Sequence, residues 1–376
     1  MILHFIMGRK VGKIKVFLSF LQDVHKDSRK GYFFLLRDFI RLKKEKGISI
    51  EEYSNFKFES RGKKFRDSFL SGVEQRPCLN LLNPKKYYIL ARNKYLSHLI
   101  LGANNIRKAE LYCYYHPEGR VKNDHIACDY DSVLAILKSK NIHSCVIKST
   151  ETSHEIRVIV VNDIEYTDKD CILHLFDGRK VCLKDRLKEY EPLIFESKIY
   201  QTKQFDSFNS SSVNTIRFMT TLYPTGDVKI IAIWMKFGRA GVCVDNAGAG
   251  GNVDAGVDIK TGRIFNVTLF DEWRETRSIT HHPDSGTLLE GVFIENWKQI
   301  TDEIIQFQKS IPYLKAIGWD IAITPEGPLV VEFNDYWDRT GQLFLGYGWK
   351  KEIQDCYKQW KKLEDVGKVS YKMGRL

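Results

Sequence analysis

The residues with the clearest capacity for chemistry lie on two short apolar runs near the end of the chain. The runs cover 318–323 and 329–334, and Thr-Pro-Glu-Gly-Pro joins them. Proline and glycine in this connection favour a reversal of the chain, so the two runs are predicted to pair as an antiparallel hairpin. Because side chains alternate across a strand, Glu332 and Asn334 share one face, and Asp320 on the partner strand can reach the same space.

Two carboxylates and an amide oxygen on one face form a set of hard oxygen ligands. Such a set suits Mg²⁺, which keeps some of its waters and takes further ligands from substrate phosphates. Val331 and Phe333 are predicted to lie on the opposite face. The alternative is that Asp320 and Glu332 are ordinary solvated side chains of a half-exposed hairpin, since acidic residues usually face water.

Six segments of the chain, taken in order, resemble the sugar-transfer-associated ATP-grasp proteins of bacterial polysaccharide clusters. They are Ser-Ser-Val-Asn-Thr-Ile-Arg at 211–217, Asp245-Asn246 with Gly250-Gly251, Val-Asp-Ile-Lys-Thr-Gly at 257–262, His-Pro-Asp-Ser-Gly at 282–286, Gly-Trp-Asp at 318–320 and Glu-Phe-Asn at 332–334. Each alone occurs by chance in many proteins, but six in the same order are specific. The resemblance is close over 211–342, thinner over 85–198 and absent before that. It favours the metal interpretation of the hairpin.

Hydrophobic periodicity and turn residues predict the elements around the hairpin. Helices are predicted over 94–101, 131–138, 294–310 and 349–363, and strands over 87–90, 145–148, 156–161, 193–196, 215–223, 228–236, 253–259 and 263–269. Mixed glycine, serine, proline and charge predict a linker over 62–83. Helices packed on antiparallel sheet indicate an α+β fold.

The resemblance implies an ATP-grasp fold, in which two α+β subdomains clamp ATP, with ATP and Mg²⁺ as cofactors. Here a basic helical N-terminal region would precede it. The predicted divisions are 1–83 for this region and linker, 84–197 for the N-terminal and first ATP-grasp subdomains, 198–348 for the second subdomain with the metal site, and 349–376 for a C-terminal helix and tail.

The predicted nucleotide contacts begin at Lys148, which ends an apolar strand just before a polar loop. The resemblance assigns a lysine there to phosphate binding, and the alternative is an exposed lysine at a strand end. The loop 149–155 lacks the glycines usual in the family, and Glu151 would repel phosphate, so the role of the loop stays open. Glu196 falls where the family places the hinge that contacts adenine and ribose, and Lys198 beside it is also predicted to bind the nucleotide.

Arg217 lies inside a predicted strand between two apolar neighbours, so it is not a casual surface charge. Its guanidinium fork matches a phosphate or an acyl-phosphate transition state, and a catalytic role is predicted for it together with Lys148. Asn246, Gly250 and Gly251 belong to a glycine-rich loop that permits close approach to the nucleotide, or that simply connects two strands.

Two further groups are predicted to contact the acceptor substrates. His282 and Asp284 lie in a His-Pro-Asp-Ser-Gly segment that either binds acceptor or only forms a turn. Asp338, Arg339 and Gln342 follow directly after the metal strand, which places them close to the second substrate.

Composition limits the remaining classes of protein. The chain has 376 residues, of which 43% are hydrophobic, and no apolar run approaches the length of a membrane span. Its eight cysteines include no Cys-x-x-Cys pair, so neither a zinc site nor a disulfide framework is predicted, and a reducing cytoplasm is the expected location.

The positive charge is concentrated near the N-terminus. Residues 1–70 hold 17 Lys or Arg and 8 Asp or Glu, which is most of the net charge of +11. An amphipathic helix predicted over 32–44 could bind an anionic membrane surface or an acidic glycolipid. The alternative is that its apolar side packs on the catalytic body. No nucleic-acid-binding motif accompanies the charge, so nucleic acid is not a favoured partner.

Together these features predict a cytoplasmic ATP-dependent carboxylate–amine ligase that acts through an acyl phosphate. The resemblance suggests that it joins an amino acid or amine to a uronic acid or similar sugar carboxylate in surface polysaccharide or capsule biosynthesis, with peripheral binding at the inner face of the membrane as a further expectation. Two alternatives stay open: a kinase of a sugar hydroxyl, and a non-catalytic nucleotide-binding scaffold.

Overall fold

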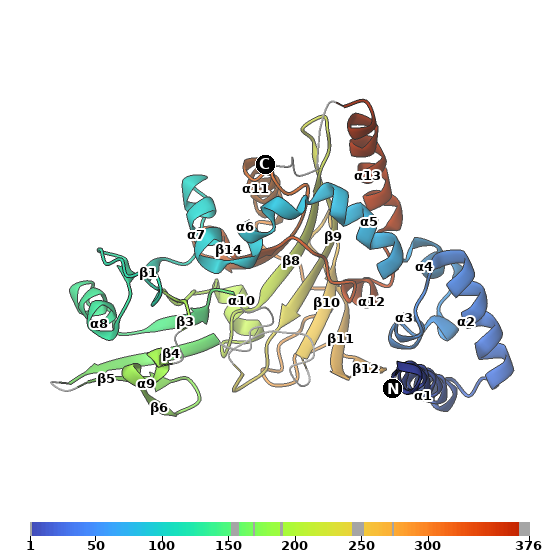
Figure 1. Ribbon diagram of the computed structural model, residues 1–376, viewed down its shortest axis with the longest axis horizontal. Coiled ribbons are helices and arrows are strands. Elements are labelled where there is room, and N and C mark those ends of the chain that lie inside the picture. The colour runs from blue at the N-terminus through green and yellow to red at the C-terminus, as the bar shows by residue number, and fades with distance from the viewer. Residues whose placement is uncertain are drawn as a thin grey trace.

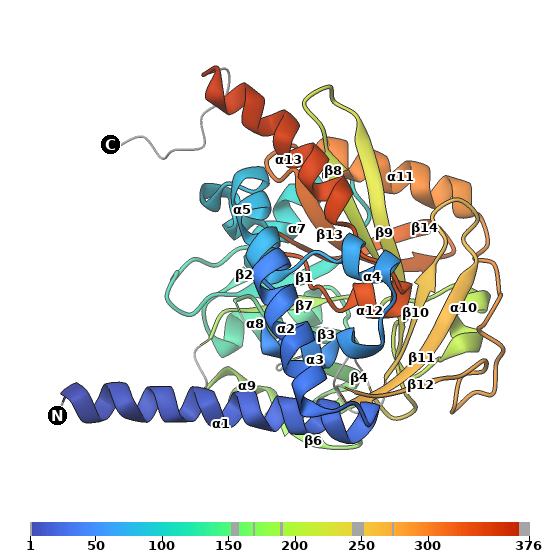
Figure 2. The ribbon, with the colours of Figure 1, turned by 90° about the vertical axis from the view of Figure 1, so that its right-hand side faces the viewer.

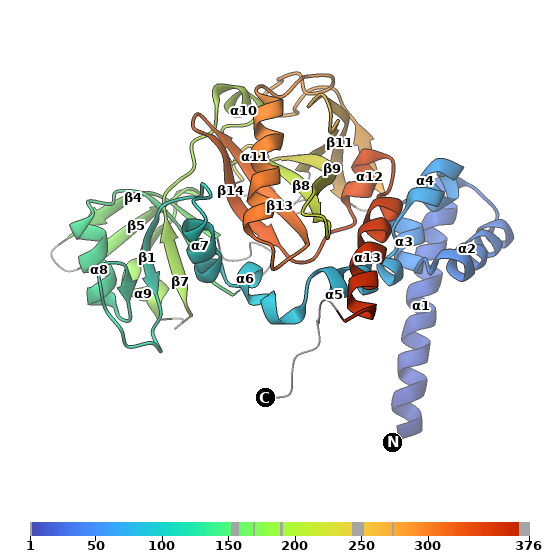
Figure 3. The ribbon, with the colours of Figure 1, turned by 90° about the horizontal axis from the view of Figure 1, so that it is seen from above.

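The computed structural model describes residues 2–151, 158–167, 170–188, 191–242, 252–272 and 274–367. Two seven-stranded sheets and a helical region lie in a row, with the second sheet in the middle (Figures 1 and 3). The first sheet has the order β2-β1-β7-β3-β4-β5-β6. Its strands are β1 (Leu111–Tyr115), β2 (Ile126–Ala127), β3 (Cys145–Ser149), β4 (Val158–Tyr166), β5 (Cys171–Leu175), β6 (Lys180–Cys182) and β7 (Leu193–Glu196).

Helices α8 (Tyr130–Ser139) and α9 (Leu183–Leu187) pack on the first sheet through a shared apolar core. The predicted helix over 131–138 is α8. Asp129 precedes this helix as its N-cap, and its side chain accepts a hydrogen bond from the backbone N–H of Ser132 and so caps the first turn.

The second sheet has the order β12-β11-β10-β9-β8-β13-β14 and is antiparallel throughout. Its strands are β8 (Thr215–Leu222), β9 (Val228–Phe237), β10 (Asn252–Val257), β11 (Ile264–Glu272), β12 (Glu275–Ser278), β13 (Ala316–Thr324) and β14 (Gly327–Asn334). The predicted hairpin is the β13–β14 pair, so this prediction is confirmed. Helices α10 (Lys203–Phe208) and α11 (Trp297–Ser310) cover one face of the sheet.

The opposite face of the second sheet packs against the N-terminal helices and the end of the chain. Met219, Trp234 and Phe270 of the sheet share one core with Leu35 and Phe39. The helices concerned are α1 (Ile2–Ser28), α2 (Tyr32–Lys46), α3 (Ile50–Asn55), α4 (Lys63–Ser68), α5 (Gly72–Leu82), α12 (Gly341–Leu345) and α13 (Lys350–Asp365), with the 3₁₀ turn η1 (Phe58–Ser60). The basic N-terminal region is therefore part of the folded body.

Two predictions of local structure are wrong. The segment 62–83 is not a linker but contains α4 and α5, because Ser71 and Glu74 form a capping box that starts α5 and because Phe65 and Leu79 are buried in the core. The expected strand at 87–90 is instead η2 (Lys85–Tyr87) followed by α6 (Ile89–Arg92) and α7 (Lys94–Ala103), which run between the two sheets. Among the described helices, none has both the length and the apolar character needed to cross a lipid bilayer.

Candidate nucleotide and metal site

A cavity of about 950 Å³ lies between the two sheets. Strands β3, β4 and β7 form one wall, and β8, β9, β13 and β14 form the other. Helices α6 and α7, residues 335–340 and several loop residues also line the cavity, as do Phe270 of β11 and Phe344 of α12. The volume is that of an ordinary ligand pocket. The cavity brings together eight of the residues predicted from sequence: Lys148, Glu196, Arg217, Asp320, Glu332, Asn334, Asp338 and Arg339.

The wall from the first sheet carries a buried group of three charged or polar side chains. Lys148 on β3 forms an ion pair with Glu196 on β7, and His98 Nε2 of α7 lies 2.9 Å from the second oxygen of the same carboxylate. Burial raises the pKa of Glu196, but Lys148 and His98 more than offset it and hold the pKa at about 2. Glu196 therefore anchors Lys148 at the cavity wall, and its predicted contact with ribose stays a prediction.

The wall from the second sheet is built on Asp320, which lies directly across from Arg217 on β8. Arg217 Nε and Nη2 donate to the two oxygens of Asp320 at 2.6 Å each, and Lys236 Nζ on β9 lies 3.2 Å from Oδ1. Burial raises the pKa of Asp320, but the two cations outweigh it and hold the pKa at about 2. The fork of Arg217 thus holds Asp320 in place, and its predicted role toward phosphate stays a prediction.

Glu332 and Asn334 complete the predicted metal set. Glu332 pairs across the hairpin with Asp320, and Asn334 pairs with Gly318. Asn334 Nδ2 lies 3.1 Å from Glu332 Oε1 and 3.4 Å from Asp320 Oδ2, so the three side chains meet at the cavity. Val331 does not lie on the opposite face with Phe333 as predicted, because a register shift makes it a bulge, and it is half-buried and lines the cavity.

These side chains fit a magnesium ion by the chemistry of their donors. Rotation of the Asn334 amide would turn its oxygen toward the two carboxylates. Within the described ranges no three or more His, Cys, Asp and Glu side chains gather as metal ligands, so the set depends on an amide oxygen and on few carboxylates. That is the pattern of Mg²⁺ sites, which complete their shell with water and substrate phosphate.

Four predicted site residues serve the fold away from the cavity. Lys198 donates a hydrogen bond to Asn162 at 2.7 Å, and His282 Nε2 lies 2.9 Å from the carbonyl oxygen of Gly238. Asp284 forms a two-pronged ion pair with Arg239. The side chain of Gln342 hydrogen-bonds to the backbone N–H and the backbone carbonyl of Leu70. The contacts of His282 and Asp284 stabilise their turn, and the predicted acceptor contact of these two residues stays a prediction. Gln342 ties α12 to the N-terminal region. Asn246, Gly250 and Gly251 lie outside the described residues.

The end of the cavity formed by residues 335–339 has neighbours that sequence reasoning missed. Arg92 of α6 forms a two-pronged pair with Asp335 at 3.0 and 2.9 Å, beside the predicted Asp338 and Arg339. Arg339 Nε lies 3.1 Å from Glu52 Oε1, so α3 supports this end. His98 and Lys236 were also missed. Lys236 could have been found, because a lysine inside an apolar strand is unusual and, two residues after Trp234, it lies on the same face of the strand as that tryptophan.

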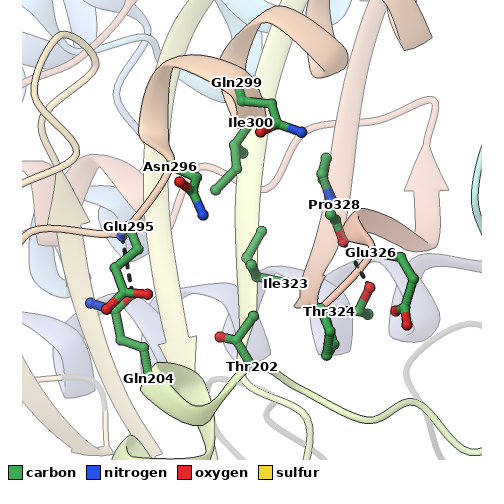
Figure 4. A pocket seen from close by; sticks show the side chains of 12 residues that line it. Thr202, Gln204, Glu295, Asn296, Gln299, Ile300, Ile323, Thr324, Glu326 and Pro328 are labelled. Atoms are coloured by element: carbon green, nitrogen blue, oxygen red, sulfur yellow. Dashed lines mark hydrogen bonds between the residues drawn. The ribbon is translucent and has the colours of Figure 1, made fainter.

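A second hollow of about 120 Å³ lies at the β13–β14 turn and the start of α11 (Figure 4). Gln204 and Glu295 lie close together there, and Gln204 Oε1 accepts from the backbone N–H of Glu295 at 3.1 Å. Its lining, all within the described residues, includes no lysine or arginine. It therefore lacks the charge to hold a polyphosphate.

The two low pKa values predict how stability depends on pH. In the unfolded chain Asp and Glu titrate near 3.9 and 4.3, above the value of about 2 for Asp320 and Glu196 in the folded protein. Their contribution to stability is therefore present above about pH 4 and is lost as the pH falls toward 2. Urea unfolding measured across this range should show the decline, and Glu196→Gln should flatten it. An unchanged slope in this variant would contradict the assignment.

The sequence model of the family described as sugar-transfer associated ATP-grasp matches residues 77–358. Comparison with curated protein sequences gave no match. One solved structure that resembles the chain is D-alanine–D-alanine ligase from Bacillus anthracis with ATP, at 11% identity and a TM-score of 0.38, with 74% of this chain and 69% of that chain covered. Phosphoribosylamine–glycine ligase from Thermotoga maritima has 11% identity and a TM-score of 0.43, with 77% of this chain and 61% of that chain covered. N5-carboxyaminoimidazole synthetase from Staphylococcus aureus with ADP has 9% identity and a TM-score of 0.35, with 68% of this chain and 47% of that chain covered.

The chain spans about half the length of the last of these structures. At such low sequence identities and TM-scores, the resemblance to these structures does not indicate the activity of this chain. The family match is different, because it covers most of the chain and every residue that lines the large cavity. It confirms the predicted ATP-grasp fold class, and the chain belongs to the sugar-transfer associated ATP-grasp family.

Proposed function

We propose that the protein is an ATP-dependent carboxylate–amine ligase that acts through an acyl phosphate. The observation that carries the proposal is that two sets of predicted site residues, one from each sheet, line the same cavity. Lys148 stands on the first sheet, and Asp320, Glu332 and Asn334 stand on the second with Arg217 beside them. Phosphoryl transfer depends mainly on positioning and charge neutralisation, and this cavity supplies cations and metal ligands on opposite sides of one space.

Each residue has a role in this proposal. Lys148 is held by Glu196 and faces the phosphates from the first sheet. Asp320, Glu332 and Asn334 would hold Mg²⁺, which neutralises phosphate charge when bound. Arg217 and Lys236 hold Asp320 as an anion and bring positive charge to the same wall.

Two bonds would change in turn. An oxygen of the substrate carboxylate attacks the γ-phosphorus of ATP, the bond to ADP breaks, and an acyl phosphate forms. The amine then attacks the acyl carbon, phosphate leaves, the amine nitrogen gives up a proton, and an amide results. Cations placed around the cavity stabilise the charge that develops on the transferred group.

The end of the cavity formed by residues 335–339, which we take as the acceptor end, favours a sugar carboxylate as one substrate. Arg92, held by Asp335, and Arg339, held by Glu52, bring positive charge to this end, which favours a carboxylate, and Asp338 could receive an ammonium group. Tyr336 also lines this end with 46% of its surface exposed, and its ring offers a flat face to a sugar. The family description mentions sugar transfer and names no substrate. The substrates that we propose are a uronic acid and an amino acid or amine, joined in surface polysaccharide biosynthesis.

The test is ADP release screened against pairs of uronic acids and amino acids, followed by the mass of the product. A ligase should need both partners and should yield their condensation product with loss of water. A product that carries a phosphate on a sugar hydroxyl, formed without any amine, would replace the proposal with the kinase alternative. Nucleotide binding without turnover on any pair would favour the scaffold alternative.

A further inference from the structure

Helix α2 has two apolar faces, of which the fold uses only one. Leu35, Phe39 and Leu42 are buried. Phe33 and Ile40 lie on the other side of the helix and are 81% and 43% exposed. A surface helix normally carries one apolar stripe, so the second requires an explanation.

The inner face fixes how α2 is oriented. The Phe39 ring lies 5.6 Å from Phe17 of α1 and 5.7 Å from Tyr53 of α3, measured between ring centres. Asp38 is buried beneath the helix, where Arg66 donates to both of its oxygens at 2.8 and 3.0 Å and Tyr53 donates at 3.0 Å. With these contacts in place the helix cannot rotate, and its second apolar stripe stays outside.

The outer face combines apolar and basic side chains. Phe33, Arg37, Ile40 and Lys44 follow one another at intervals of three and four residues, so they form one stripe along the helix, and Leu36, which is 37% exposed, lies beside it. Arg41 and Lys43 flank the stripe on its two sides. The acidic residues of the helix lie elsewhere, because Asp38 points inward and Glu45 is turned by about 100° from Lys44.

We propose that this outer face of α2, defined by Phe33, Leu36, Arg37, Ile40 and Lys44, binds the surface of a lipid bilayer that contains anionic lipids. Apolar side chains flanked by cations are typical of helices that lie in the interface of a membrane. The helix lies at the outer edge of the molecule in two views and faces the viewer in a third (Figures 1, 2 and 3). A second copy of the chain fits less well, because a symmetric contact would bring like charges together.

The experiment uses the full chain, since the N-terminal helices share the core with the second sheet. Binding is measured by co-sedimentation with vesicles of phosphatidylcholine, with and without phosphatidylglycerol. We expect binding only to the anionic vesicles and a decline as salt is added, because the Debye length falls from about 10 Å at 0.1 M to about 3 Å at 1 M.

Two sets of variants separate the apolar from the charged part. The triple variant Phe33→Ser/Leu36→Ser/Ile40→Ser and the double variant Arg37→Gln/Lys44→Gln should each weaken binding at least roughly tenfold, with the thermal midpoint and ADP release unchanged. Matched controls are Tyr200→Ser and Lys298→Gln, whose side chains are exposed on other parts of the surface. These controls should bind as the unchanged protein does.

Three results would overturn the proposal. One is the absence of binding to anionic vesicles at low salt. Another is binding that the triple serine variant retains in full, which would indicate charge attraction without insertion. The third is a dimer in analytical ultracentrifugation that the triple variant dissociates, together with no vesicle binding, which would assign the face to a second copy. None of these results depends on the proposed ligase activity.

Discussion

Glu332→Gln is expected to abolish ADP release while the protein stays folded. Glu332 lies at the cavity, directly across β13–β14 from Asp320, and its Oε1 is 3.1 Å from Asn334 Nδ2. Glutamine keeps the size and the hydrogen-bonding capacity of this side chain but removes the charge that a divalent cation requires. Turnover should fall by at least about two to three orders of magnitude, as when one electrostatic group of an active site is removed.

The matched control for this variant is Glu326→Gln in the turn of the same hairpin. Glu326 is exposed and lies outside the large cavity, so the change removes the same charge without touching the predicted metal set. ADP release would be measured as a function of Mg²⁺ concentration, together with urea unfolding of both variants. Normal Mg²⁺-dependent turnover in Glu332→Gln would show that the hairpin is not the metal site.

The part of the site that is local in sequence could be predicted. A turn of proline and glycine was enough to predict the hairpin, because this signal acts over a few residues. The position of Glu332 opposite Asp320 also needs the bulge at Val331, since unshifted pairing from the turn would place Val331 there. The bulge at Val331 was not predictable in this way. It depends on how β13 pairs with both of its neighbours, and nothing in the residues of β14 alone records it.

The non-local part could not be predicted from the chain. Lys236 reaches Asp320 only because β9, β8 and β13 lie side by side in that order. His98 reaches Glu196 because α7 packs against the cavity from a distant part of the sequence. The contact between His282 Nε2 and the carbonyl of Gly238 could not be predicted either, because the two residues are 44 positions apart in the sequence. Contacts between residues could therefore be predicted only where the strands that carry them are adjacent in sequence, as β13 and β14 are.

The N-terminal region shows why the absence of a family resemblance was a poor guide to its role. Charge and scattered glycines suggested a separate helical segment with a linker, but Leu70 bonds Gln342 and Glu52 supports Arg339. These contacts join the N-terminal region to α12 and, through Glu52 of α3, to Arg339, which lines the cavity.

The second large effect is expected at Arg217, whose fork holds the buried Asp320. Arg217→Met leaves Asp320 with Lys236 as its remaining close cation among the described residues, and removing one partner of a buried pair costs about 3–5 kcal/mol of unfolding free energy. Arg217→Lys keeps the charge but loses the two-pronged geometry, so it should cost less, about 1–3 kcal/mol. Its turnover should still fall by orders of magnitude, with ATP binding reduced less.

A comparison of pairs separates the structural from the catalytic part of this effect. Arg239→Met breaks a similar two-pronged pair with Asp284, but at a more exposed site, so it should cost no more than about 1 kcal/mol and leave turnover unchanged. In the double variant Arg217→Met/Asp320→Leu no buried carboxylate is left unpaired, so stability should recover in part while turnover stays absent. If stability recovers and turnover recovers with it, Arg217 and Asp320 are a structural pair and the chemistry lies elsewhere in the cavity.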